Sequence, residues 1–319
     1  MYEIDNSSLL PDGLPRILPP YEDGIFQAIL TLPESREALR SAVAAFLDRT
    51  VQSVTLRNNA APKRDKRAKQ EQYDINCVVD GGDGDQCNVE MQATQMKLDN
   101  IGNEHVNIRC RSVFNLCDLH AAQEGKGLAY GDFARSYQVT LCKYRVFREK
   151  QNLVERFTFR TPEGKELCDA VTAIFIDLSQ AEEIAKKPVS EMTPIERWAV
   201  FFALGNVPEY YGIIDDITKQ EEGIAVAKET LSNISRNPDE RARFHSRRIW
   251  LQDREHENAA IRKEVRLELE PVIASKDAII ADKDAIIADK DAKLADKGAK
   301  LADKDAIIAK LTAQLDQMK

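Results

Sequence analysis

The chain has few cysteines and no long apolar run. Its 319 residues include six cysteines, none of them in a CxxC pair, so neither a zinc cluster nor a disulfide framework is indicated, and a reducing compartment fits best. No stretch reaches the roughly 18 apolar residues of a membrane-spanning helix. Four prolines stand within the first 20 residues, where a signal peptide would need an apolar run. We therefore expect a cytoplasmic protein with no membrane partner.

The commonest catalytic signatures are also missing. The sequence contains no P-loop, GxSxG or HExxH motif, and its four histidines are not spaced as metal ligands or as a catalytic pair. The acidic loop from Asp80 to Asp85 lacks the ligand spacing of an EF-hand, which argues against calcium binding. Any catalytic site must therefore be found from strand and helix patterning.

Positive charge is scarce overall but concentrated locally. A net charge of −8 argues against a protein that coats nucleic acid, because phosphate binding needs clustered Lys and Arg. Between residues 57 and 73, however, six basic residues outnumber two acidic ones. This run is either a solvated surface or a surface that holds a phosphate backbone. Its candidate DNA-binding residues are Arg57, Lys63, Arg64, Lys66, Arg67 and Lys69.

Hydrophobic periodicity divides the chain into four parts. We expect an irregular arm over residues 1–20, a mixed α/β domain over 21–180, a helical extension over 181–270 and a repeat helix over 271–319. The elements predicted within them are two helices, or one kinked helix, over 22–47 with a break at Pro33, a hairpin of strands 73–79 and 87–92, a helix over 103–123, strands 137–147 and 170–176, and helices 194–204 and 221–234.

From Ser275 a seven-residue unit related to DKDAIIA repeats five times. A strict seven-residue period predicts a long helix and favours a coiled coil that joins copies of the chain. The apolar positions do not form a clean seam, however, because Ile279 and Ile280 fall on opposite flanks. The pairs Asp289–Lys293 and Asp296–Lys300 suit a solvated single helix equally well. Homo-oligomerisation through this segment is therefore one of two open interpretations.

The segment from Asp74 to Gln92 carries the candidate chemistry. In an antiparallel hairpin centred on Gly82, opposed residue numbers sum to 164, so Asp74 lies across from Glu90. Two opposed carboxylates repel each other unless a proton or a cation intervenes, and Mg²⁺ is commonly held by one or two carboxylates. Gln92 shares the face of Glu90 and could orient a water or a phosphate. The alternative is an exposed acidic hairpin without a metal.

The strings Tyr73-Asp74-Ile75 and Asn88-Val89-Glu90-Met91-Gln92 resemble the signature of the Rpn family of recombination-promoting nucleases and transposases, in the PD-(D/E)XK superfamily. Further matching pieces occur in the family order between residues 21 and 255: Asp23 with Phe26, Arg111-Ser112, Gly127 to Tyr130, Ala173 to Leu178, and Arg241 to Arg248. The chain departs from the family pattern at the aromatic residue of the central helix, where Phe114-Asn115 stands.

This resemblance implies an α/β, restriction-endonuclease-like core and DNA cleavage that depends on Mg²⁺ or Mn²⁺. It implies that Asp74 and Glu90 bind the metal, with Asp23 of the first helix as a third acid. Gln92 stands where the wider superfamily has a lysine, so the charge of that lysine is missing. Arg111, on the central helix, contacts either DNA phosphate or a neighbouring acid.

The sequence supports three hypotheses of function. The first is a DNA endonuclease linked to recombination or transposition, in which Asp74, Glu90 and Gln92 are catalytic. The second is a DNA-binding or assembly protein that keeps the fold but cuts poorly. The third is a helical scaffold without a nucleic-acid partner. Metal-dependent cleavage separates the first from the others.

Overall fold

The computed structural model describes residues 16–57, 74–81, 84–93, 104–123, 129–147 and 152–317. The chain divides into two compact units, residues 1–245 and 246–319. The elements, in order, are α1 (Asp23–Thr31), the 3₁₀ turn η2 (Pro33–Ser35), α2 (Arg36–Leu47), β1 (Val54–Leu56), β2 (Ile75–Val79), β3 (Asp85–Gln92), α3 (Glu104–Ala121), η3 (Tyr130–Asp132), β4 (Ser136–Cys142), β5 (Val154–Arg160), β6 (Glu166–Asp177), η4 (Leu178–Gln180), α4 (Ala181–Ile184), η5 (Val189–Glu191), α5 (Pro194–Leu204), η6 (Pro208–Tyr210), α6 (Tyr211–Gln220), α7 (Glu222–Arg236) and α8 (Pro238–Gln317).

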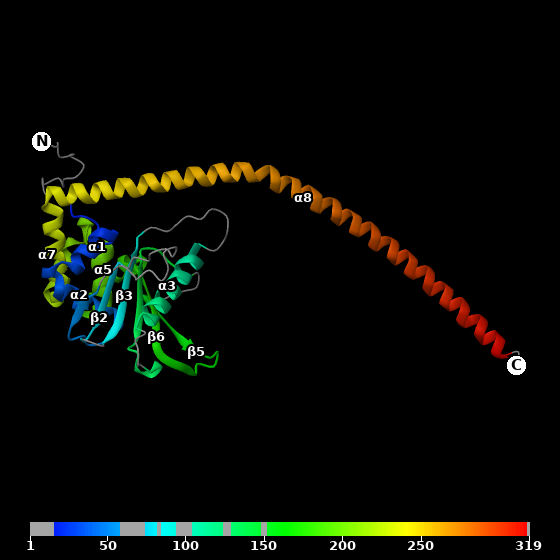
Figure 1. Cartoon of the computed structure of the whole chain (residues 1–319), viewed down its shortest axis with the longest axis horizontal. Coiled ribbons are helices and arrows are strands. Elements are labelled where there is room, and N and C mark those ends of the chain that lie inside the picture. Colours follow the sequence, from blue (N-terminus) through cyan, green and yellow to red (C-terminus); the bar gives the residue numbers. More distant parts are fainter. Residues whose placement is uncertain are drawn as a thin grey trace. The chain divides into compact units, whose positions relative to one another are not determined.

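The strands form one mixed sheet in the order β1-β2-β3-β4-β6-β5. The strand pairs towards each edge run antiparallel, whereas β3 pairs parallel with β4, and β4 parallel with β6. A parallel pair needs a crossover, and α3 provides it between β3 and β4. In Figure 1, α3 lies on one side of the sheet, and α1, α2, α5 and α7 lie on the other.

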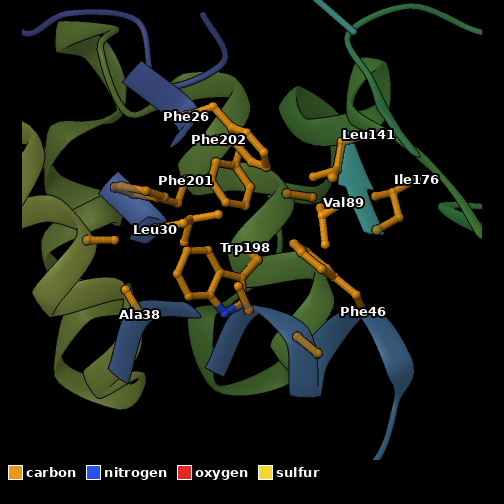
Figure 2. Packing of buried hydrophobic residues seen from close by; sticks show 14 of the residues in the cluster. Phe26, Leu30, Ala38, Phe46, Val89, Leu141, Ile176, Trp198, Phe201 and Phe202 are labelled. Atoms are coloured by element: carbon orange, nitrogen blue, oxygen red, sulfur yellow. The ribbon is translucent and has the colours of Figure 1, made fainter. Parts of the chain in front are cut away.

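The side of the sheet that faces α1, α2, α5 and α7 is apolar. Val89, Leu141 and Ile176 project from three adjacent strands into the same fully buried cluster as Trp198 (Figure 2). Trp198 stacks on Phe202 with 5.1 Å between ring centroids, and its indole Nε1 donates a hydrogen bond to Ser41 Oγ (3.1 Å). The buried indole N–H thus has the partner that it needs. The extension beyond residue 181 consequently shares one core with the first two helices.

The side that faces α3 is different, because its centre is polar. We call the buried polar side chains here the polar layer; it consists of Gln86, Asn88 and Glu90 of β3, Gln138 and Thr140 of β4, and Ser112 and Asn115 of α3. Among the described residues, a small apolar cluster also lies on this side, in which Ile108 and Leu116 of α3 meet Phe175 of β6. Helix α3 therefore meets the sheet through both polar and apolar side chains.

Several predicted elements are confirmed. The break at Pro33 separates α1 from α2, and the predicted helix 194–204 has those bounds in the structure. That helix begins where expected because Thr193 and Glu196 form a capping box and Pro194 occupies the first turn. The predicted strand 137–147 is wrong in its second half, because β4 ends at Cys142. The chain then leaves the sheet, and the side-chain ammonium of Lys143 donates a hydrogen bond to the carbonyl of Ala203 (2.8 Å).

Helix α8 contains the seven-residue repeats. Lys293 and Lys300 pair with Asp289 and Asp296, each at 2.6 Å, as the i,i+4 spacing predicts. Large apolar side chains at seven-residue intervals are exposed along the helix: Ile273, Ile280, Ile287, Leu294, Leu301 and Ile308. No helix in the described residues is long and apolar enough to cross a bilayer.

Candidate active site

The β2–β3 hairpin has the predicted register. Ile75 pairs with Val89 and Val79 with Asp85, so opposed residue numbers sum to 164. The turn that sets this register begins at Asp80 and Gly81, both at positive φ (62° and 90°). Continued by one residue beyond Ile75, the same register puts Asp74 opposite Glu90.

Glu90 is almost fully buried, at 4% exposure. Arg111 Nη2 lies 2.7 Å from its Oε2, and Asn115 Nδ2 donates to its Oε1 at 2.6 Å. Asn88, two residues earlier on the same face of β3, adds a long contact of 3.4 Å to Oε1. Because Arg111 and Asn115 are four residues apart, they lie on one face of α3. A buried carboxylate requires such charge-assisted hydrogen bonds.

Asp74 is partly buried at the start of the hairpin. Its Oδ2 accepts the Met91 backbone N–H (3.0 Å), and its Oδ1 lies 3.5 Å from Gln27 Nε2 of α1. Burial, together with the nearby charges of Asp23 and Glu90, raises the pKa of the Asp74 carboxyl from 3.8 to about 7. The repulsion predicted for opposed acids is therefore present in the folded chain.

Asp23 and Gln92 lie at the margin of this pair. Asp23 is the first residue of α1 and is near enough to Asp74 to affect the pKa of its carboxyl. Gln92 is the last residue of β3, half-buried, and its carbonyl accepts the Lys143 amide (3.0 Å). Among the described residues, no three His, Cys, Asp or Glu side chains lie close enough together to hold a metal ion. Asp74 and Glu90 thus form the centre of the candidate site.

The donor atoms at this centre suit a hard cation. Asp74 and Glu90 offer carboxylate oxygens, and Gln92 offers an amide oxygen, with no thiolate or imidazole among them. Mg²⁺ prefers oxygen ligands and keeps several waters, so two carboxylates and a substrate phosphate are enough to hold it. The residues present therefore fit Mg²⁺ or Mn²⁺.

The candidate DNA-binding residues are largely beyond the described part of the chain. Arg57 comes directly after β1 as an exposed residue, and its backbone N–H donates to the Asn76 carbonyl (2.8 Å). Lys63, Arg64, Lys66, Arg67 and Lys69 lie outside the described residues. Of the two partners predicted for Arg111, the structure contains the neighbouring acid.

Sequence reasoning missed two neighbours of the acids. Gln27 contacts Asp74, and Asn115 contacts Glu90. Helical spacing provides a weak signal for both, because Gln27 lies four residues after Asp23, and Asn115 four residues after Arg111. That spacing shows which residues share a helix face, but not which strand the face meets.

A mixed six-stranded sheet between helices is consistent with the fold of PD-(D/E)XK nucleases. The family model for PD-(D/E)XK nuclease family transposases matches residues 20–260. The chain belongs to this family, which confirms the resemblance found in the sequence. No curated protein and no solved structure gives a significant match.

Proposed function

We propose that the chain is a metal-dependent DNA endonuclease that hydrolyses phosphodiester bonds during recombination or transposition. The observation that carries this proposal is the hairpin register, which brings Asp74 opposite Glu90 in a chain of a nuclease family. The donor set supports Mg²⁺ or Mn²⁺ as the cofactor.

Each polar residue has a distinct role in this proposal. Asp74 and Glu90 hold the cation, and Asp23, which does not complete a three-acid cluster among the described residues, contributes negative charge from the margin. A cation bound there would polarise the scissile phosphate and lower the pKa of a water molecule. Gln92 orients the attacking water through its side-chain amide. Because Gln92 is neutral, it cannot neutralise the charge that develops on the phosphate.

The basic run that begins at Arg57 serves as the backbone-binding surface in this proposal. In the sequence this run stands between β1 and Asp74, the residue directly before β2. Contacts between Lys or Arg and phosphates release counterions, and such binding weakens steeply as salt is added.

Nicking of supercoiled plasmid tests the proposal. We expect nicking with Mg²⁺ that EDTA abolishes. The isosteric variants Asp74→Asn and Glu90→Gln should nick about 100-fold more slowly or worse, because a lost metal ligand removes several kcal/mol of transition-state stabilisation. Glu163→Gln, at an exposed turn of the β5–β6 hairpin, is the matched control and should nick at the wild-type rate. Full activity in Asp74→Asn would contradict the assignment.

A DNA-binding protein that cuts poorly is the second candidate. It is favoured by one observation: both oxygens of Glu90 already accept hydrogen bonds from α3, and Gln92 carries no charge. Under this alternative, a gel-shift assay shows DNA binding while the plasmid remains supercoiled with either metal.

A further inference from the structure

Among the described residues, Arg111 is a cation in direct contact with Glu90 of the candidate site. Its guanidinium pairs with Glu90 at 2.7 Å, although its side chain remains 41% exposed. Its charge also acts against the rise in the pKa of Asp74. The side chain therefore contacts the buried acid while part of it remains accessible to solvent.

Lys143 is a less suitable cation, although its amide hydrogen-bonds to Gln92. Its ammonium donates to the Ala203 carbonyl and lies 4.1 Å from the centre of the Tyr21 ring. Both partners belong to the helical side of the sheet, whereas Glu90 faces α3. Within the described residues, Arg111 is thus the better placed of the two to replace the missing charge at position 92.

The polar layer around Glu90 can accommodate water, which could take the place of the Arg111–Glu90 hydrogen bond. Within the described residues, Ser112 Oγ, Thr140 Oγ1 and Gln138 Nε2 are buried without a hydrogen-bond partner, and so is one amide oxygen each of Asn88 and Asn115. Buried polar atoms in this position are usually satisfied by water. Water can take over contacts between α3 and Glu90, while Ile108 and Leu116 keep the helix on the sheet.

We propose that Arg111 is a catalytic residue with two positions, an inference that rests on the proposed nuclease function. In the metal-free protein it holds Glu90. When Glu90 engages a divalent cation, the guanidinium moves to a non-bridging oxygen of the scissile phosphate and supplies the positive charge that Gln92 lacks. Arg suits this role because its planar fork matches phosphate geometry and it stays protonated throughout.

The reaction is ordinary hydrolysis. The bond from the water oxygen to phosphorus forms, and the bond from phosphorus to the leaving sugar oxygen breaks. One proton of the water ends on the sugar hydroxyl and the other on the new phosphomonoester. Arg111 neither gives nor accepts a proton, and its contribution is to stabilise the charge of the transition state.

Two measurements on the full-length chain test this role: Mn²⁺ binding without DNA, by calorimetry, and single-turnover plasmid nicking at saturating Mn²⁺. Arg111→Met should bind Mn²⁺ about tenfold more tightly, since a competing charge is gone, and should nick about 100-fold more slowly. A merely structural role would weaken both. Arg109→Met is the control, because Arg109 lies two residues earlier on α3, over the Phe147 ring, and should change neither.

Arg111→Lys gives the same test if the Met variant does not fold. Lys keeps the charge but not the fork, so we expect nicking about tenfold slower, with Mn²⁺ binding at least as tight as in the wild type. Weaker metal binding in either variant, or wild-type nicking in either, overturns the inference. A wild-type chain that neither binds Mn²⁺ nor nicks overturns the proposed function as well, and this outcome is distinguishable from failure of Arg111 alone.

Discussion

The carboxyl of Asp74 is the most perturbed acid of the candidate site, with its pKa raised to about 7 by burial and by the neighbouring acids. The folded chain therefore holds this proton more tightly than the unfolded chain, whose pKa is near 3.8. The stability contributed by this group is then greatest below about pH 4 and falls as pH rises towards 7. A shift of this size corresponds to at most about 4 kcal/mol.

Asp74→Asn should remove this dependence on pH. In EDTA, we expect the variant and the wild type to have similar free energies of unfolding near pH 4. At pH 8 the variant should be more stable by up to about 4 kcal/mol. Urea unfolding across this range measures the difference. Equal pH profiles would mean that the carboxyl is not protonated in the folded chain. Added Mn²⁺ should stabilise only the wild type.

The hairpin register that carries Asp74 and Glu90 could be predicted from sequence, but the partners of these two acids could not. Alternation along a strand and a turn rich in glycine are enough to predict the register, and its continuation by one residue places Asp74 across from Glu90. The contacts of Arg111 and Asn115 with Glu90 depend on where α3 sits on the sheet. That position is set by packing across the crossover, which local pattern does not encode.

Packing between α2 and α7 depends on a glycine. A Cβ atom at Gly223 would lie 2.3 Å from Ser41 Cβ and 3.1 Å from the Glu37 carbonyl oxygen. The Ser41 hydroxyl already makes two hydrogen bonds, because its Oγ accepts from Trp198 Nε1 and donates to Glu221 (2.7 Å). The two helices can approach this closely only without a side chain at position 223.

We expect Gly223→Ala to lower the free energy of unfolding by about 2 kcal/mol, because overpacking forces the helices apart and outweighs the higher helix propensity of Ala. Gly212→Ala in α6 is the control, since nothing lies within 4 Å of its Cβ. It should be neutral or more stable by up to about 1 kcal/mol. Thermal unfolding of both variants decides the matter, and equal effects would refute the packing argument.

Elements with a clear period or clear caps were predicted, and the missed elements share a physical reason. β1 is only three residues long, β5 is largely exposed, and α6 buries only two of its residues, Ile214 and Ile217. Such segments offer little apolar pattern to recognise. The parallel pairing of β3 with β4, and of β4 with β6, is likewise invisible to local pattern, because it joins strands that are far apart in the chain.

At the scale of the whole molecule, the described site residues and the core belong to the unit that ends at residue 245, whereas the repeats belong to the second unit. A chain that ends after Ala274 should therefore keep the thermal midpoint of unfolding and the nicking rate within about twofold of the full-length chain. A chain that ends after Asn237 should melt earlier, because Phe244 packs on the core and Arg241 donates to the carbonyls of Arg16 and Ser235.

These truncations are checked by calorimetry and by plasmid nicking, and sedimentation of the same proteins tests self-association through the repeats. If the cut after Ala274 abolished nicking while leaving the fold intact, cleavage would require joined copies of the chain. The predicted coiled coil would then be part of the catalytic assembly.

The repeated unit also makes the length of α8 adjustable. Because the five seven-residue units are closely related, gain or loss of one whole unit keeps the exposed apolar side chains in the same order. Each unit adds about 10 Å of helix and rotates the next unit by about 20°. The helix can thus change length in fixed steps without a change in the hairpin that carries Asp74 and Glu90, since the repeats and the hairpin belong to separate units.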